Sequence, residues 1–327
     1  MPKMMKAIQI SNDQSLVWED FEKPEPSSNE VLIKISATAI NRADLVQRNG
    51  GYPPPPGASS ILGLECAGEV VALGDKCQRF REGDQVCALL SGGGYAEYAT
   101  VDEGSVLPVP QGLSYREAAG IPEVFATAWL NLFIEAGLRP GEKVVLHAGA
   151  SGVGTAAIQM CRISGVDTFV TVGNESKLDY CLDLGATAGF NRHNGSFVES
   201  VQAFAPNGVD VILDPVGASY LEDNLKILRL NGRLVLIGLM GGANADIDLA
   251  SLMLKRVRVI GSTLRARPIR EKAEVMRQLE ERLWPAFSSG EVSVTIDSVL
   301  SIAQAEQGHT LIASDQTIGK VILELDH

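Results

Sequence analysis

The sequence predicts an α/β protein in which a β-rich domain is followed by a doubly wound parallel sheet. Three observations support this class. Short alternating or β-branched runs fill the chain up to about residue 122, and strands alternate with helices from about residue 123 onward. A glycine-rich turn joins the first strand of the alternating part to its helix. Such alternation is typical of parallel sheets that are covered by helices on both faces.

The amino-terminal part is expected to form a compact β-barrel-like domain. Its strand-like runs are short, and glycine and proline clusters separate them, as in many all-β domains. The proline run 53–56 predicts a stiff loop that would hold Tyr52 in place, because each proline fixes φ and removes a backbone donor. The clearest predicted strands cover residues 6–10, 30–35, 67–72, 85–90 and 96–101.

The second part follows the strand and helix order of a doubly wound sheet. The tail returns to strand, so it is expected to rejoin the first domain. The domains are therefore predicted at 1–122 with 268–327, and at 123–267. The predicted strands are 143–147, 168–172, 188–191, 209–213, 233–237, 257–262, 298–299 and 320–325, and the predicted helices are 155–160, 176–184, 197–204, 220–228 and 271–287.

The charge balance argues against nucleic acid as the main partner. The 327 residues include 28 Lys and Arg against 40 Asp and Glu, a formal net charge of −12, whereas phosphate backbones require a basic surface. No apolar stretch is long enough to span a bilayer, and the first residues lack the apolar core of a signal peptide, so we expect a cytoplasmic protein without membrane association. Five cysteines without a C-x-x-C pair predict reduced, mostly buried thiols.

The stretch 143–154 predicts a dinucleotide-binding turn. An apolar strand leads into Gly149, Ser151, Gly152 and Gly154, and a helix follows. Small residues let the backbone approach a pyrophosphate, and the N–H groups and positive dipole end of the helix would hold its charge. Ser151 would add a hydroxyl donor. The spacing departs from G-x-G-x-x-G, and an ordinary turn is the alternative, but the flanking strand and helix favour a cofactor site.

Several separate motifs together resemble the medium-chain dehydrogenase/reductase superfamily. They include Asn-Arg-Ala-Asp at 41–44, the stretch 61–68, the turn 147–154 and Ile-Gly-Lys at 318–320, and they extend over essentially the whole chain. Within the superfamily, the chain is most similar to zinc-independent, zeta-crystallin-like quinone oxidoreductases of the stress-inducible mammalian type. The resemblance implies a GroES-like β-barrel catalytic domain and a Rossmann domain with a doubly wound parallel sheet.

The resemblance also implies that no metal takes part. In the zinc-dependent branch a cysteine and a histidine hold the catalytic metal, and the matching positions here are Asn41 and Leu64. Leu64 has no donor atom, and a catalytic zinc needs three protein ligands. The structural zinc lobe of four closely spaced cysteines is missing as well. We therefore expect no metal site.

The expected cofactor is NADPH. NAD-selective folds place an Asp or Glu about 20 residues past the glycine turn, whereas this chain has Gly173 and Asn174 there, and Glu175 is expected to be the first-turn acid of the next helix. Lys177 and Arg192 could pair with the 2′-phosphate, and solvated surface charge is the alternative for both. Other contacts are expected, partly by resemblance, from Thr127, Gly149, Ser151, Gly152, Val153, Gly154, Gly238, Leu239, Met240, Gly241 and Leu264.

The expected reaction is hydride transfer from NADPH to a quinone in the interdomain cleft. By resemblance, Asn41 and Tyr52 face the substrate, and either neutral side chain could polarise a carbonyl oxygen. Packing against the proline loop is the alternative for Tyr52. Arg42 and Asp44 are expected to form an internal ion pair, and His147 is expected to be structural.

Two other functions stay open. A 2-enoyl thioester or other enone reductase of the same superfamily would use a tyrosine placed like Tyr52, and a non-catalytic NADPH-binding protein would need no acceptor. Assembly is the last expectation. The apolar strand 257–264 ends the predicted sheet, and its unpaired edge predicts a homodimer.

Overall fold

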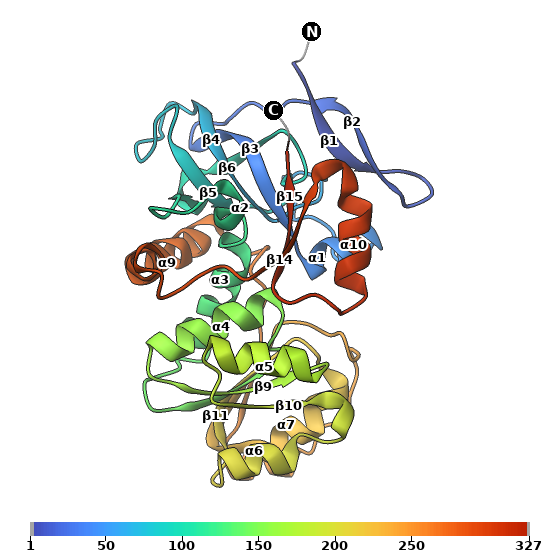
Figure 1. Ribbon diagram of the computed structural model, residues 1–327, viewed down its shortest axis with the longest axis vertical. Helices are drawn as coiled ribbons and strands as arrows, with labels where there is room; N and C mark the ends of the chain where they lie inside the picture. The colour runs from blue at the N-terminus through green and yellow to red at the C-terminus, as the bar shows by residue number, and fades with distance from the viewer. Residues whose placement is uncertain (1–2, 326–327) are drawn as a thin grey trace. The chain divides into compact units, whose positions relative to one another are not determined.

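The computed structural model describes residues 3–325, whose contacts divide them into two units. Unit 1 comprises residues 3–126 and 264–325, and unit 2 comprises residues 127–263 (Figure 1). The chain leaves unit 1 within helix α3 (Pro122–Trp129) and returns to it after strand β13 (Arg258–Gly261). None of the helices in the described part is long and apolar enough to cross a membrane.

Strand β3 (Glu30–Ile40) is the centre of the main sheet of unit 1. Strand β4 (Glu65–Leu73) pairs with one side of it, while β6 (Tyr98–Asp102) and β15 (Lys320–Glu324) share the other side, all three antiparallel to β3. The carboxyl-terminal strand β15 therefore lies in the same sheet as β3 and β4, which come from the amino-terminal part of the chain. The remaining strands of this sheet are β5 (Gln85–Leu89), β7 (Val106–Pro108) and β14 (Ile296–Ser301).

The hairpin of β1 (Met4–Ile10) and β2 (Leu16–Glu22) joins the sheet of unit 1 through a bridge between Ala7 and Ala96. Apolar side chains from both share one core, because alternate residues of each strand point inward. The other helices and helical turns of unit 1 are α1 (Arg42–Arg48), η1 (Glu103–Ser105), α2 (Tyr115–Ala118), α9 (Ile269–Ser289), η5 (Ile302–Gln304) and α10 (Ala305–Ala313).

Unit 2 is a six-stranded parallel sheet in the order β10-β9-β8-β11-β12-β13, which confirms the predicted doubly wound arrangement. Helices α4 and α5 lie on one face, and α6 and α7 lie on the other (Figure 1). The strands are β8 (Lys143–His147), β9 (Asp167–Val172), β10 (Ala188–Asn191), β11 (Val209–Asp214), β12 (Leu228–Leu236) and β13. The helices and helical turns are η2 (Leu130–Glu135), α4 (Gly152–Ile163), α5 (Glu175–Leu184), η3 (Arg192–Asn194), α6 (Val198–Phe204), η4 (Ala218–Tyr220), α7 (Leu221–Ile227) and α8 (Leu249–Lys255).

The strand order of unit 2 creates a switch point between β8 and β11. The chain runs outward from β8 through β9 to β10, and it then crosses back to place β11 on the other side of β8. Parallel sheets bind ligands at the carboxyl ends of the strands beside such a switch. The glycine turn follows β8, so the fold places it at this edge.

All five cysteines are unpaired, as expected. Four of them are buried, and burial raises the pKa of the Cys66 and Cys161 thiols above the usual range. A thiol with a raised pKa stays protonated and unreactive at neutral pH.

Candidate active site

The turn between β8 and α4 fits a dinucleotide pyrophosphate. A Cβ at Gly149 would lie 2.6 Å from a β9 side chain, and a Cβ at Gly154 would lie 2.4 Å from the Gly149 carbonyl oxygen, so both positions require glycine. Ser151 caps α4, and its Oγ accepts the N–H of Gly154 at 3.1 Å. The N–H groups of Gly152 and Val153 belong to the first helical turn, where the helix itself supplies no acceptor. An anion would satisfy them.

The turn after β9 has no carboxylate at the position that selects NAD. Asn174 is there instead, and it caps α5 by accepting the N–H of Lys177 at 2.9 Å. Glu175 is the first-turn acid, as expected, and it accepts a hydrogen bond from the Asn191 amide at 2.9 Å. The Lys177 side chain is only 5% exposed, which excludes a solvated surface charge. Arg192 lies in η3, immediately after β10.

The loops after β11 and β12 pack closely against each other. Gly241 donates its N–H to the β11 loop at 2.7 Å, and a Cβ at Gly238 would lie 2.7 Å from the Pro215 carbonyl oxygen. These two glycines therefore permit the close approach of the two loops. Leu239 and Met240 lie between these two glycines in the chain. Each leaves more than half of its surface exposed at the carboxyl edge of the sheet.

The structure brings most of the predicted cofactor residues to one edge of unit 2. The turns after β8, β9, β10 and β12 all leave the sheet at its carboxyl end, since the strands are parallel. Thr127 is not in one of these turns. It belongs to helix α3, where its carbonyl oxygen accepts a hydrogen bond from the Asn131 side-chain amide at 2.7 Å. Leu264 is buried and follows β13 in the chain. The residues that this edge collects are Gly149, Ser151, Gly152, Val153, Gly154, Gly173, Asn174, Lys177, Arg192, Gly238, Leu239, Met240 and Gly241.

His147 is structural, as expected. Its Nε2 donates to the Asn224 Oδ1 at 2.7 Å, and its Nδ1 lies 2.9 Å from the Thr171 hydroxyl. The Asn224 amide donates in turn to the Asp214 carboxylate at 3.0 Å. Burial lowers the pKa of His147, so the neutral ring holds the ends of three neighbouring strands of the sheet together.

A lysine interacts with Asn41, the residue that matches a metal-ligand position of the zinc-dependent branch. The Lys320 Nζ donates to the Asn41 Oδ1 at 2.6 Å and forms an ion pair with the Glu65 Oε1 at 2.8 Å. The Asn41 Nδ2 donates to the same Glu65 oxygen at 2.8 Å. Both ends of the Asn41 amide are therefore engaged within unit 1, and a role of Asn41 toward the acceptor stays a prediction. Leu64 is buried.

The expected ion pair of Arg42 and Asp44 is wrong. The Asp44 carboxylate is fully buried in unit 1, where it accepts the N–H groups of Asn41 and Gly63 at 2.8 and 3.0 Å. The Arg42 guanidinium instead donates to the carbonyl oxygen at residue 312. Asp44 points inward because it is the third residue of α1 and caps the start of that helix.

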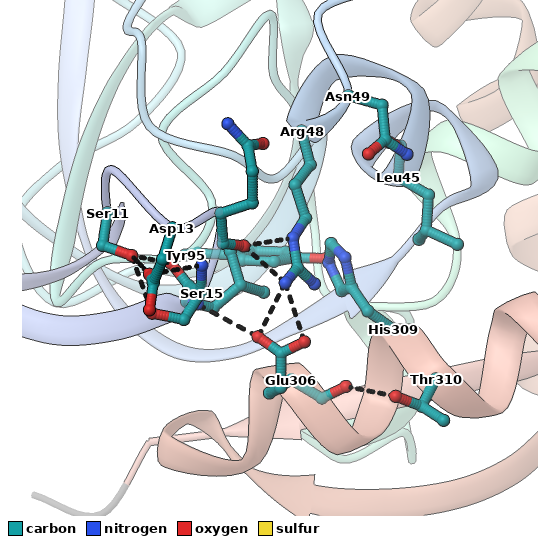
Figure 2. A network of polar contacts seen from close by, with 12 residues as sticks. Ser11, Asp13, Ser15, Leu45, Arg48, Asn49, Tyr95, Glu306, His309 and Thr310 are labelled. Atoms are coloured by element: carbon teal, nitrogen blue, oxygen red, sulfur yellow. Dashed lines mark hydrogen bonds and ion pairs between the residues drawn. The ribbon is translucent and has the colours of Figure 1, made fainter.

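A polar network connects Asp44 to α10. The Tyr95 hydroxyl donates to Asp44 at 3.1 Å and lies 3.2 Å from the His309 Nε2. Figure 2 shows His309 beside Arg48, which forms an ion pair with Glu306 at 2.7 Å. Burial raises the pKa of Asp44 to about 6, and burial together with the Arg48 charge lowers the pKa of His309 to about 4. Both groups therefore titrate away from their usual range.

Tyr52 is half-buried beside a cationic side chain. The Arg265 guanidinium lies 5.3 Å from the centre of the Tyr52 ring and donates to the Tyr52 carbonyl oxygen at 3.1 Å. Burial raises the pKa of the Tyr52 hydroxyl, although the Arg265 charge opposes this rise. Within residues 3–325 that hydroxyl has no hydrogen-bond partner, so it can donate to a ligand.

Comparison with known proteins identifies the family. Residues 27–111 match the alcohol dehydrogenase GroES-like domain, and residues 152–281 match the zinc-binding dehydrogenase family. The quinone oxidoreductase of Rattus norvegicus is 31% identical over 99% of this chain and 98% of its own, and that of Mus musculus is 30% identical over the same shares. The chain belongs to the quinone oxidoreductase type of the medium-chain dehydrogenase/reductase superfamily.

Solved structures of superfamily members agree with this assignment. A mycobacterial protein complexed with NADPH is 27% identical, with a TM-score of 0.86 over 98% of this chain and 99% of its own. CurK enoyl reductase is 26% identical, with a TM-score of 0.84 over 98% of this chain and 99% of its own. The quinone oxidoreductase fold expected from the sequence, a GroES-like unit and a Rossmann unit, is thus confirmed.

Sequence reasoning missed three charged residues of unit 1, namely Glu65, Arg265 and Lys320. Lys320 precedes the apolar residues 321–323 of β15, and Glu65 follows Leu64 directly, so each stands out as a charge in buried surroundings. Nothing in their spacing shows that they meet. Arg265 lies just after the last strand of unit 2, where a surface charge would be the ordinary interpretation.

Proposed function

We propose that this quinone oxidoreductase relative reduces quinones with NADPH and without a metal ion. The carboxyl edge of unit 2 would hold the cofactor, which supplies a hydride when bound. The surroundings of Tyr52 in unit 1 would hold the acceptor. Hydride addition leaves a negative charge on the acceptor oxygen, and one proton then completes the hydroquinone.

The Tyr52 hydroxyl is the observation that carries this proposal. It is half-buried, and within the described chain it has no hydrogen-bond partner. Because its pKa is raised, it stays protonated at neutral pH and can donate to the acceptor oxygen as charge develops there. The proline run that follows restricts the loop and limits the positions that the ring can take.

NADPH is proposed over NADH because of the turn after β9. No carboxylate stands where it would repel a 2′-phosphate, and Glu175 is bonded to the Asn191 amide. Lys177 and Arg192 are the two cations proposed to pair with that phosphate. The mycobacterial protein that was solved with NADPH has the same fold, so this fold can accommodate that cofactor.

Metal independence rests on the side chains around Asn41. A metal needs several donors in one place, and no three His, Cys, Asp or Glu side chains of residues 3–325 group closely enough to hold one. The Lys320 ammonium already neutralises Glu65 beside Asn41. We propose that Asn41 positions this buried pair. Exhaustive chelation should leave turnover intact, and a stoichiometric metal that is lost together with activity would contradict the proposal.

An enone or 2-enoyl thioester reductase is the second candidate. It is favoured by the structural similarity to CurK enoyl reductase. The two candidates share the cofactor site and the use of Tyr52, so they differ only in the acceptor. A non-catalytic NADPH-binding protein is a third outcome, which the geometry favours less because the Tyr52 donor would then have no use.

Steady-state oxidation of NADPH separates these readings. The acceptors are a panel of 1,2- and 1,4-quinones, a 2-enoyl thioester and a blank without acceptor. Quinone-dependent oxidation above the blank supports the proposal. Faster reduction of the thioester would favour the second candidate, and tight NADPH binding without any acceptor-dependent oxidation would overturn both.

A homodimer through β13 is also part of the proposal. In the described part of the chain β13 is the last strand of its sheet. The Ser262 N–H donates to β12 at 3.0 Å, and strand residues alternate in direction, so the N–H groups of Val259 and Gly261 point away from β12. A second copy related by a two-fold axis would supply their partners. The preceding helix α8 adds exposed apolar side chains at Leu249, Met253 and Leu254.

A further inference from the structure

Unit 1 buries two cations that have no carboxylate partner. Arg265 is 6% exposed and Lys272 is 8% exposed, and neither forms an ion pair with any described residue. The Lys272 Nζ donates to the Ser91 Oγ at 2.8 Å, and the Arg265 Nε donates to the Ser91 carbonyl oxygen. Both cations therefore contact Ser91. In a chain with a net charge of −12, two buried and uncompensated positive charges are conspicuous. Buried charges are normally paired.

The guanidinium of Arg265 is held in place with one nitrogen left over. Its Nε donates to the Ser91 carbonyl oxygen at 2.8 Å, and its Nη1 donates to the Tyr52 carbonyl oxygen at 3.1 Å. Its Nη2 is buried and has no hydrogen-bond partner. A guanidinium carries five N–H donors in a fixed plane, so a planar anion would satisfy the unused ones.

The guanidinium that carries the unused donors lies beside the ring of Tyr52. The guanidinium carbon is 5.3 Å from the centre of the Tyr52 ring, and the hydrogen bond to the Tyr52 carbonyl oxygen attaches the Arg265 side chain to the loop that carries Tyr52. Lys272 adds a second positive charge nearby, because its Nζ lies 3.5 Å from the Arg265 carbonyl oxygen. An acceptor whose carbonyl meets Tyr52 would therefore bring its substituents close to a positive region.

We propose that Arg265 recognises an anionic group on the acceptor, so that the preferred substrates are quinones or enones that carry a carboxylate. This inference rests on the proposed function, since it uses Tyr52 as the group that faces the reducible carbonyl. A carboxylate pairs with the planar guanidinium better than with an ammonium, because two parallel N–H donors match its two oxygens. The Arg265 guanidinium only binds the carboxylate of the acceptor, and the reduction of the acceptor carbonyl is unchanged.

The test compares two probes that differ only in charge. They are a 1,4-naphthoquinone with a propionate side chain and its methyl ester, which share the same quinone ring. Calorimetric titration into the NADPH-free protein should show the acid binding at least about 10-fold more tightly than the ester, as a charge-assisted pair would give. A ratio of one or below in the unsubstituted protein would overturn the inference.

Arg265→Gln should reduce the acid-to-ester ratio to about one, and Arg265→Lys should leave an intermediate ratio, because the charge stays while the planar pair is lost. Arg270→Gln is the matched control, since Arg270 is exposed nearby in the chain and its loss should not change the ratio. Arg265→Lys also keeps the test open if the glutamine variant fails to fold. A ratio that survives both Arg265 substitutions would refute the assignment.

NADPH affinity distinguishes this role from a cofactor contact. Fluorescence titration should give the same NADPH affinity in Arg265→Lys as in the unsubstituted protein, and a loss there without a change in the probe ratio would assign Arg265 to the cofactor instead. The binding assay does not need turnover. A protein that prefers the acid through Arg265 but reduces no quinone would uphold this inference and refute the proposed function.

Discussion

Lys320 and Glu65 form an ion pair of 2.8 Å inside unit 1, although they lie in distant parts of the sequence. Their side chains are 3% and 0% exposed, and Asn41 bonds to both. The Glu65 carboxylate also accepts the backbone N–H of Glu123 at 2.9 Å. The pair therefore joins four segments of unit 1, namely the start of α1, the first residue of β4, the start of α3 and the first residue of β15.

Removing one member of this pair should be more damaging than removing both charges. Lys320→Met leaves a buried carboxylate unpaired, and the free energy of unfolding should fall by about 3–5 kcal/mol. Adding Glu65→Gln removes the stranded charge while keeping an acceptor oxygen, so the double variant should be more stable than Lys320→Met alone. Denaturant unfolding of the unsubstituted protein, Lys320→Met, Glu65→Gln and the double variant completes the cycle. Strictly additive losses would contradict the coupling.

Lys177→Ala should weaken NADPH binding by about 10-fold or more while leaving NADH nearly unchanged. The buried ammonium is proposed to make a charge-assisted bond to the 2′-phosphate, which only NADPH carries. Titration by cofactor fluorescence measures both affinities. Lys226→Ala serves as control, because that ammonium pairs with Glu222 and Asp223 at the surface. An equal loss for both cofactors would refute the assignment of Lys177.

Asp44 and His309 should make opposite contributions to the pH dependence of stability. The pKa of Asp44 is raised to about 6 in the folded protein, so between pH 4 and 6 the folded state holds a proton that the unfolded chain has released. The free energy of unfolding therefore falls as the pH rises, by about 2–3 kcal/mol in total. The pKa of His309 is lowered to about 4, so its contribution rises with pH up to about 6.5.

Two substitutions separate these contributions. The loss of stability caused by Asp44→Asn should shrink as the pH rises from about 4 to 6, because ionised Asp44 is itself destabilising. The loss caused by His309→Gln should grow over the same range. Unfolding of each variant and of the unsubstituted protein at several pH values gives the differences. Parallel profiles for the two variants would show that these groups do not titrate as described.

Val259→Pro should abolish the proposed dimer without unfolding the monomer. The N–H at this position points away from β12, so the substitution removes no bond within the sheet but does remove a donor from its open edge. Light scattering at micromolar concentration should show a dimer for the unsubstituted protein and for Val259→Thr, and a monomer for Val259→Pro. A monomeric unsubstituted protein, or a dimeric proline variant, would count against this interface.

Local patterns predicted most of unit 2 and little of the charged interior of unit 1. Strand 188–191 and a helix at 155–160 follow from the alternation of short apolar runs with glycine turns, and the observed α4 extends that helix from Gly152 to Ile163. The Lys320–Glu65 pair could not be predicted in this way, because the register between β15 and β3 sets it and no local pattern reports that register. The opposite charges of Arg42 and Asp44 led to a wrong prediction of an ion pair, because helix capping turns the Asp44 side chain inward.

The function of Tyr52 decides the central claim. If its hydroxyl stabilises charge on the acceptor oxygen, Tyr52→Phe should slow hydride transfer by about 10²-fold, the usual effect of losing one such donor. NADPH affinity should stay unchanged, because the substitution removes only a hydroxyl in unit 1. Tyr98→Phe is the matched control, since the Tyr98 ring packs under the Lys23 ammonium at 3.3 Å and is assigned no part in the reaction.

The most direct measurement is a single turnover with chelator-treated protein. The protein is loaded with NADPH, mixed rapidly with a 1,4-quinone, and followed by the loss of NADPH absorbance. Our account predicts one equivalent of NADPH oxidised in the metal-free protein, at a rate about 10²-fold lower in Tyr52→Phe and unchanged in Tyr98→Phe. Bound NADPH that stays reduced, or an equal rate in both tyrosine variants, would contradict it.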